Sequence, residues 1–191
     1  MADLYAEVRR TGADEQSWAA WREGRDALLA THPQTPVAPG ARAGFTGMPF
    51  FAYDPSWRLV GRVEPAGGEG ASAPDGTFVP IGQVVAEREG QEIRLTLMWL
   101  DAYGGGLFLP FRDATCGDET YGGGRYLLDQ VKGADLGVDA AGDLVVDFNF
   151  AYHPSCAHDP RWTCPLAPEG NRIAQPVRAG EMLPGADDTQ S

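Results

Sequence analysis

Positive charge is scarce in this sequence, and lysine is almost missing. Its 191 residues include 15 Lys and Arg against 27 Asp and Glu, a formal net charge of −12 at pH 7, and Lys132 is the single lysine. Such an acidic surface repels phosphate backbones and anionic lipids. We therefore expect neither nucleic acid nor a membrane surface as a partner. An arginine bias of this kind, beside abundant Ala and Gly, is typical of a GC-rich bacterial genome.

Long apolar runs and cysteine are scarce as well. No run of about 18 apolar residues occurs, which excludes a transmembrane helix. The first ten residues, MADLYAEVRR, are charged and lack the apolar segment of a secretory signal. We therefore expect a cytoplasmic protein. Its three cysteines, Cys116, Cys156 and Cys164, are then expected to be reduced thiols.

The composition that is present indicates one globular unit. Hydrophobic residues make up 43% of the chain, and there are 25 Gly and 15 Pro. This content predicts a packed core interrupted by many turns. A length of 191 residues favours a single domain over residues 1–191.

The N-terminal segment, residues 1–34, has helical spacing, with helices predicted over 2–10 and 15–31. An apolar stripe at intervals of three and four residues is formed by Trp18, Trp21, Arg25, Leu28 and Leu29. Asp14 is placed to cap the second helix, and His32-Pro33 to end it.

After a Pro/Gly/Ala-rich connector at 35–44, the pattern changes to the two-residue period of strands. Strands are predicted near 48–53, 57–64, 77–88, 92–100, 106–112, 124–132, 143–150 and 172–179. Short strands at this spacing indicate a mainly β fold, an antiparallel β-barrel or sandwich behind one or two N-terminal helices. Residues 45–180 form this β-rich core, and 184–191 a flexible tail.

The first polar stretch is FRDATCGDETYGGGRYL, at 111–127. Three consecutive glycines, Gly122 to Gly124, indicate that the backbone approaches a ligand or a neighbouring strand. No GKS or GKT ending and no GxGxxG pattern supports a phosphate-binding loop. Arg125 suits either an anionic substrate or a buried partner such as Asp113 or Glu119, and the sequence leaves both roles open.

The second polar stretch is DFNFAYHPSCAHDPRWTCPLAPEGN, at 147–171. His153, Cys156, His158 and Cys164 are zinc-ligand types, but their spacing matches no standard zinc pattern, so we expect no metal. A Cys156 nucleophile assisted by His153 or His158 is an alternative. In a third interpretation, Cys156 and Cys164 are packed as small apolar residues.

Together the two stretches resemble the hallmark region of a bacterial family of unknown function, domain-of-unknown-function family 1684. The resemblance in the first stretch rests on the pattern F-[KR]-D-x-T-x-G-x-x-T-Y-G-x-G-R-Y, carried by Phe111, Arg112, Asp113, Thr115, Gly117, Thr120, Tyr121, Gly122, Gly124, Arg125 and Tyr126. In the second it rests on Asp147, Asn149, Ala151, Tyr152, Pro154, Cys156, Ala157, Cys164, Pro165, Pro168 and Asn171. The resemblance implies no activity. Cys116, His153 and His158 stand at positions that the pattern does not require.

Our hypothesis is a small-molecule enzyme with a polar pocket built from these two stretches. The predicted catalytic residues are Tyr121, Glu119 and Cys156, and the predicted substrate-binding residues are Arg125, Asp113, Asn149 and Tyr152. The alternatives are a non-catalytic β-barrel that binds a small ligand and an interaction module that docks through its Gly/Pro loops. The sequence specifies neither a cofactor nor an oligomeric state.

Overall fold

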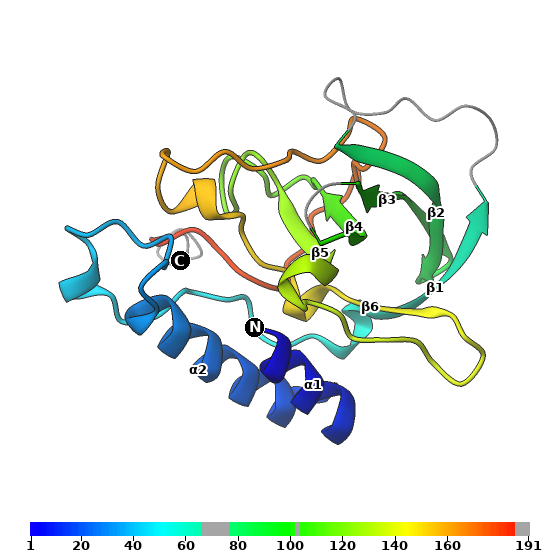
Figure 1. Ribbon diagram of the computed structural model, residues 1–191. Coiled ribbons are helices and arrows are strands. Elements are labelled where there is room, and N and C mark those ends of the chain that lie inside the picture. The colour runs from blue at the N-terminus through cyan, green and yellow to red at the C-terminus, as the bar shows by residue number, and fades with distance from the viewer. Residues whose placement is uncertain (66–76, 102–103, 186–191) are drawn as a thin grey trace.

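The computed structural model describes residues 1–65, 77–101 and 104–185 (Figure 1). The α-helices are α1 (Ala2–Thr11) and α2 (Glu15–Thr31). The strands are β1 (Arg58–Pro65), β2 (Phe78–Arg88), β3 (Gln91–Leu100), β4 (Gly106–Phe111), β5 (Arg125–Asp129) and β6 (Leu144–Asp147). Most of the predicted C-terminal tail, from residue 186 onward, lies outside the described residues.

Both N-terminal helices form where the spacing predicts them. Asp14 caps α2 by accepting a hydrogen bond from Ser17 N at 2.8 Å, and the Ser17 hydroxyl in turn accepts one from Asp14 N. This reciprocal pair satisfies two amides that the first turn would otherwise leave unpaired. No helix within the described ranges is long and apolar enough to cross a membrane.

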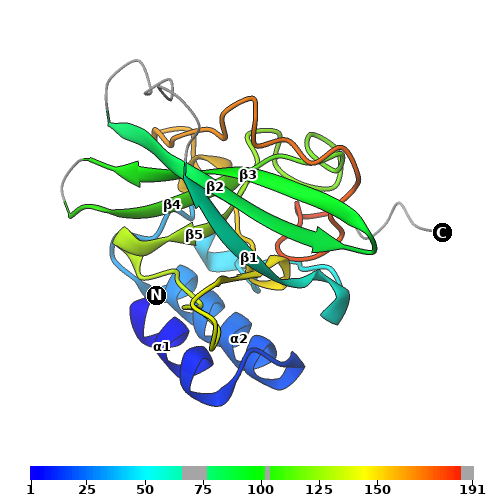
Figure 2. The ribbon, with the colours of Figure 1, turned by 90° about the vertical axis from the view of Figure 1, so that its right-hand side faces the viewer.

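The strands form one antiparallel sheet in the order β5-β4-β3-β2-β1-β6. The sheet curls into a nearly closed barrel, with α1 and α2 side by side along its outside (Figures 1 and 2). The prediction of a mainly β, antiparallel barrel with N-terminal helices is confirmed. The long β2–β3 hairpin turns at Glu89 and Gly90, which both have positive φ.

Two predicted strands, 48–53 and 172–179, are not strands in the structure. Each makes only an isolated bridge, Phe50 with Glu181 and Arg172 with Arg112. Pro49 and Pro176 carry no N–H to donate to a ladder. Side chains bind the backbone instead, as Asp113 does when it accepts the amide of Val177 at 2.7 Å. The C-terminal segment is therefore held by side chains and by scattered backbone hydrogen bonds, such as that from the Glu181 amide to Ala151 O, rather than by a ladder of a sheet.

Apolar residues gather in two adjoining cores. One fills the barrel around Leu95, Leu109 and Phe111, and the other lies between the helices and the barrel. In the second, the Trp21 ring meets Phe150 edge to face with centroids 5.0 Å apart, and Trp18 donates from Nε1 to Asn149 O at 2.8 Å. The helices are thus fixed over residues 148–152, which belong to the second polar stretch.

The three consecutive glycines differ in what they require. Gly124 has φ +92°, and a Cβ there would lie 2.3 Å from Phe111 O. A Cβ at Gly122 would make only an ordinary contact, since its nearest heavy atom would lie 3.8 Å away.

We predict that Gly124→Ala lowers the free energy of unfolding by about 2–4 kcal/mol. Gly122→Ala should change it by less than about 0.5 kcal/mol. Urea unfolding of both variants measures this. Equal effects at the two positions would contradict it.

Candidate functional site

All three histidines of the chain line one cavity of about 330 Å³. The single lysine lines it as well. The cavity, called the histidine cavity below, is bounded by Met1, Arg25, Leu28, Leu29, His32, Gln34, Thr35, Pro36, Lys132, Tyr152, His153, Ser155 and His158. No Asp or Glu among the described residues lines it, although the protein is strongly acidic. Its lining therefore combines apolar side chains with nitrogen-bearing ones.

A buried ion pair stands at this cavity. Arg25 Nη2 lies 2.7 Å from Glu181 Oε2, and both side chains are almost completely buried. The same carboxylate oxygen accepts the His153 amide at 2.6 Å. Burial acts to raise the pKa of Glu181, but the Arg25 charge opposes it and the net pKa lies below the usual value. Glu181 is therefore a permanent anion at neutral pH.

The guanidinium of Arg25 has N–H donors that are not paired within the described part of the chain. One guanidinium nitrogen binds Glu181, while its buried Nε has no hydrogen-bond partner within the described part of the chain. The guanidinium also lies over the Tyr152 ring, 5.1 Å from its centroid. A planar fork with unused donors beside a cavity is suited to a carboxylate.

His158 lies near the second carboxylate oxygen of Glu181, the one that Arg25 does not bind. Its Nε2 lies 4.0 Å from Glu181 Oε1, and neither atom has a hydrogen-bond partner among the residues the structure describes. Burial lowers the pKa of His158, so its imidazole is neutral at pH 7. A neutral imidazole beside a buried carboxylate can accept a proton and have the resulting charge stabilised.

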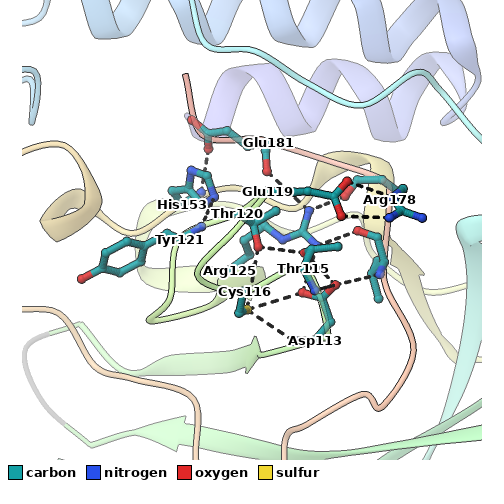
Figure 3. A network of polar contacts seen from close by, with 12 residues as sticks. Asp113, Thr115, Cys116, Glu119, Thr120, Tyr121, Arg125, His153, Arg178 and Glu181 are labelled. Carbon is teal, nitrogen blue, oxygen red and sulfur yellow. Dashed lines mark hydrogen bonds and ion pairs between the residues drawn. The ribbon is translucent and has the colours of Figure 1, made fainter. Parts of the chain in front are cut away.

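His153 joins the two polar stretches. Its Nε2 accepts a hydrogen bond from Tyr121 N at 3.1 Å (Figure 3). Burial lowers the pKa of His153 to about 4. Both histidines also line a second, largely apolar cavity of about 210 Å³ that includes Phe45, Met48 and Leu183. His153 and His158 therefore form a wall common to two cavities.

Arg125 is fully buried, and its partners belong to the protein itself. It donates to the carbonyls of Val177, Ala179 and Glu181, and lies 3.3 Å from Asp113 (Figure 3). Asp113 also accepts the Val177 amide. These contacts match the buried structural role that the sequence left open for Arg125. They hold the backbone that carries Glu181 into the site.

The other predicted residues divide between scaffold and cavity. Asn149 is fully buried and exchanges two hydrogen bonds of 2.9 Å with the backbone of Asp54. Glu119 forms a bidentate pair with Arg178, at 2.8 and 3.1 Å. Tyr152 lines the histidine cavity while its hydroxyl donates to Asp129. Their predicted substrate-binding and catalytic roles remain predictions.

Tyr121 and Cys156 are brought together. Both are partly exposed, and a hydrogen bond to Cys156 is the first cause that raises the pKa of Tyr121, followed by burial. Neither lines the histidine cavity. No group of three or more His, Cys, Asp or Glu in the described ranges is arranged to hold a metal ion. The expectation that the protein binds no metal stays a prediction.

The model of a family described as "Protein of unknown function (DUF1684)" matches residues 43–182. The chain belongs to the DUF1684 family. A solved structure, the solution NMR structure of an uncharacterized protein of Haloarcula marismortui, is similar to this DUF1684 protein with a TM-score of 0.62 and 29% identity. That match covers 93% of this chain and 96% of the other, so it extends beyond residues 43–182. No curated protein matches the chain.

Sequence reasoning missed four residues of the site in this DUF1684 protein, namely Arg25, His32, Lys132 and Glu181. For Arg25 a signal was present, because a charged residue in the apolar stripe of a helix needs a buried partner. Glu181 lies near the C-terminus among Gly, Met, Leu and Pro, where no spacing or motif marks it. Its surroundings come from residues distant in sequence.

The contacts of Arg125 lead to a stability prediction. A lysine cannot reach the carbonyls of the 177–181 segment and Asp113 together, so Arg125→Lys should lower the free energy of unfolding by about 3–5 kcal/mol. Arg178→Lys is the matched control, because Arg178 lies on the same 177–181 segment, is exposed and pairs with Glu119. We expect its effect to be below about 1 kcal/mol. Urea unfolding measures both, and a native-like Arg125→Lys would contradict the structural role.

His153 leads to a pH prediction. Its folded pKa of about 4 lies below the unfolded value, so the unfolded chain binds the extra proton between these two pH values. Its contribution to stability is complete above pH ~6.5 and is lost as the pH falls toward ~4, by on the order of 3 kcal/mol. His153→Gln retains an acceptor for Tyr121 N and should lack this component. Unfolding free energies of both proteins from pH 4 to 7 test it, and parallel curves would refute it.

Proposed function

We propose that this DUF1684 protein binds a small organic acid in the histidine cavity. The observation that carries the proposal is the buried Arg25, which lines the cavity and whose Nε has no hydrogen-bond partner among the described residues. A carboxylate is planar and accepts two parallel hydrogen bonds, which matches this fork. Lys132 and His32 add further nitrogen atoms to the lining.

The remaining lining residues indicate which kind of group the acid carries besides its carboxylate. Leu28, Leu29 and Pro36 give the cavity apolar walls, and the Tyr152 ring stands beside Arg25. A volume of about 330 Å³ is at the small end of the range for ligand pockets. These features favour a monocarboxylic acid with a compact apolar body over a sugar phosphate or a nucleotide.

A panel of carboxylates tests the proposal, with acetate, hexanoate, benzoate and phenylacetate as probes. The acids with apolar bodies should raise the melting temperature, since a ligand at a hundred times its Kd stabilises the fold by about 2.7 kcal/mol. Arg25→Lys keeps a charge opposite Glu181 but loses the fork, so the Kd should rise at least about tenfold. Calorimetric titration measures the Kd.

Arg22→Lys is the matched control for this experiment. Arg22 lies one turn earlier on α2, stacks over Trp18 and Phe50 and does not line the cavity. Its Kd should stay within about twofold of wild type, a difference of less than about 0.5 kcal/mol. A panel without a stabilising acid, or an Arg25→Lys protein that binds as tightly as wild type, would refute the proposal.

A second candidate, an enzyme acting on the bound acid, is favoured by His158. Its neutral imidazole lines the cavity and lies 4.0 Å from Glu181, so it is placed to take a proton from a ligand. Closure of that distance on binding would let Glu181 stabilise the imidazolium. The His158→Gln protein should then bind acids with the wild-type Kd but no longer convert them. Conversion is followed by NMR spectra of the acid. Bound acids left unchanged by the wild type would eliminate this candidate.

A further inference from the structure

Cys156 and Cys164 are in contact through a hydrogen bond that brings their side chains together. The Cys156 amide donates to Cys164 Sγ at 3.2 Å, and both cysteines are free and partly exposed. An N–Cα bond of about 1.46 Å then puts that sulfur within about 4.7 Å of the Cys156 Cα. Because the Cβ atoms of a disulfide lie only about 3.5–4.5 Å apart, each sulfur must approach the other cysteine's Cα about this closely.

The two thiols also affect each other's ionisation. The pKa of the Cys164 thiol lies above its usual value, first because of burial and next because of a hydrogen bond with the Cys156 side chain. The Cys156 amide works in the opposite direction by stabilising the Cys164 thiolate. The Cys164 sulfur therefore lies beside Cys156 when Cys156 forms a bond to an outside thiol.

Cys116 has different surroundings. Its thiol lies 3.5 Å from Asp113 Oδ1, and its sulfur accepts hydrogen bonds from Asp113 N and Thr120 Oγ1. It belongs to the network around Arg125 and is partly exposed like the other two. Among the three cysteines, it therefore serves as an internal reference for the reactivity of an isolated thiol.

We infer that Cys156 and Cys164 form a thiol–disulfide exchange site whose substrate is a low-molecular-weight disulfide. One thiolate attacks the substrate, its S–S bond breaks, and a mixed disulfide forms while the first small thiol leaves. The second cysteine thiolate attacks the protein sulfur of that mixed disulfide and releases the second small thiol. The protein loses two electrons and two thiol protons, and the substrate disulfide gains both as two thiols.

The position of the pair gives this exchange a structural consequence. The bond would close the segment between Cys156 and Cys164, which contains His158 and follows Ser155. Both of those residues line the histidine cavity, and His158 lines the second cavity too. Oxidation would thus enclose His158, a residue of both cavity walls, in a covalent loop. The inference does not depend on the organic-acid proposal.

The reduced full-length protein, incubated with oxidised glutathione, tests the inference. After acid quenching and alkylation, the intact mass should show the loss of two hydrogen atoms and one remaining alkylated thiol. Peptide mapping should place the bond between Cys156 and Cys164. Cys116→Ser should be oxidised at a rate within twofold of wild type, and Cys156→Ser should stop at a mixed disulfide with glutathione on Cys164.

Two results would overturn the inference. One is a wild-type protein whose three thiols all remain alkylatable across glutathione buffers from reducing to oxidising. The other is glutathione attached to all three cysteines with no link between Cys156 and Cys164, which is the behaviour of unrelated surface thiols. A circular dichroism spectrum and melting curve of each variant confirm that it is folded before its thiols are counted.

Discussion

A buried carboxylate, that of Glu181, joins the parts of this structure that the sheet does not connect. Arg25 reaches it from α2, the His153 backbone binds it from the second polar stretch, and His158 stands beside it. Burying a carboxylate costs several kcal/mol unless its partners are in place. The helices, the barrel and the C-terminal segment must therefore all be positioned before this charge is satisfied. The histidine cavity is lined by Arg25, His153 and His158, the three residues that surround this carboxylate.

Features of the fold that depend on neighbouring residues could be predicted from the sequence, and features that depend on distant partners could not. The helical stripe of Trp18 and Trp21 and the two-residue period of β3 are local patterns, and both led to correct elements. Residues 48–53 and 172–179 have strand-like composition, but prolines and side-chain acceptors divert their backbones. The acceptor is Asp26 for the amide of Met48 and Asp113 for the amide of Val177. Both acceptors lie outside the segment that they bind, and a local pattern contains no information about them.

The residues of the candidate site were also only partly predictable from local sequence patterns. Polar residues clustered in two stretches predicted a pocket there, and Tyr152 does line a cavity. Arg125, Asp113 and Asn149 bind the protein's own backbone, and their roles toward a substrate stay predictions. Irregular segments leave amides and carbonyls that a sheet would have paired, and buried groups of this kind need side-chain partners. A dense polar motif in a β protein with long connections can therefore reflect architecture, and burial of each side chain decides between architecture and function.

The distance in sequence between Arg25 and Glu181 has a consequence for biosynthesis. A ribosome adds about 5–20 residues per second, so the helical hairpin emerges many seconds before its carboxylate partner. Trp18 and Trp21 pack on Phe50, which is made early, but Trp21 also packs on Phe150, which arrives late. During that interval the apolar face of α2 is incompletely covered and Arg25 is unpaired. The last residues to be made therefore complete the burial of the first.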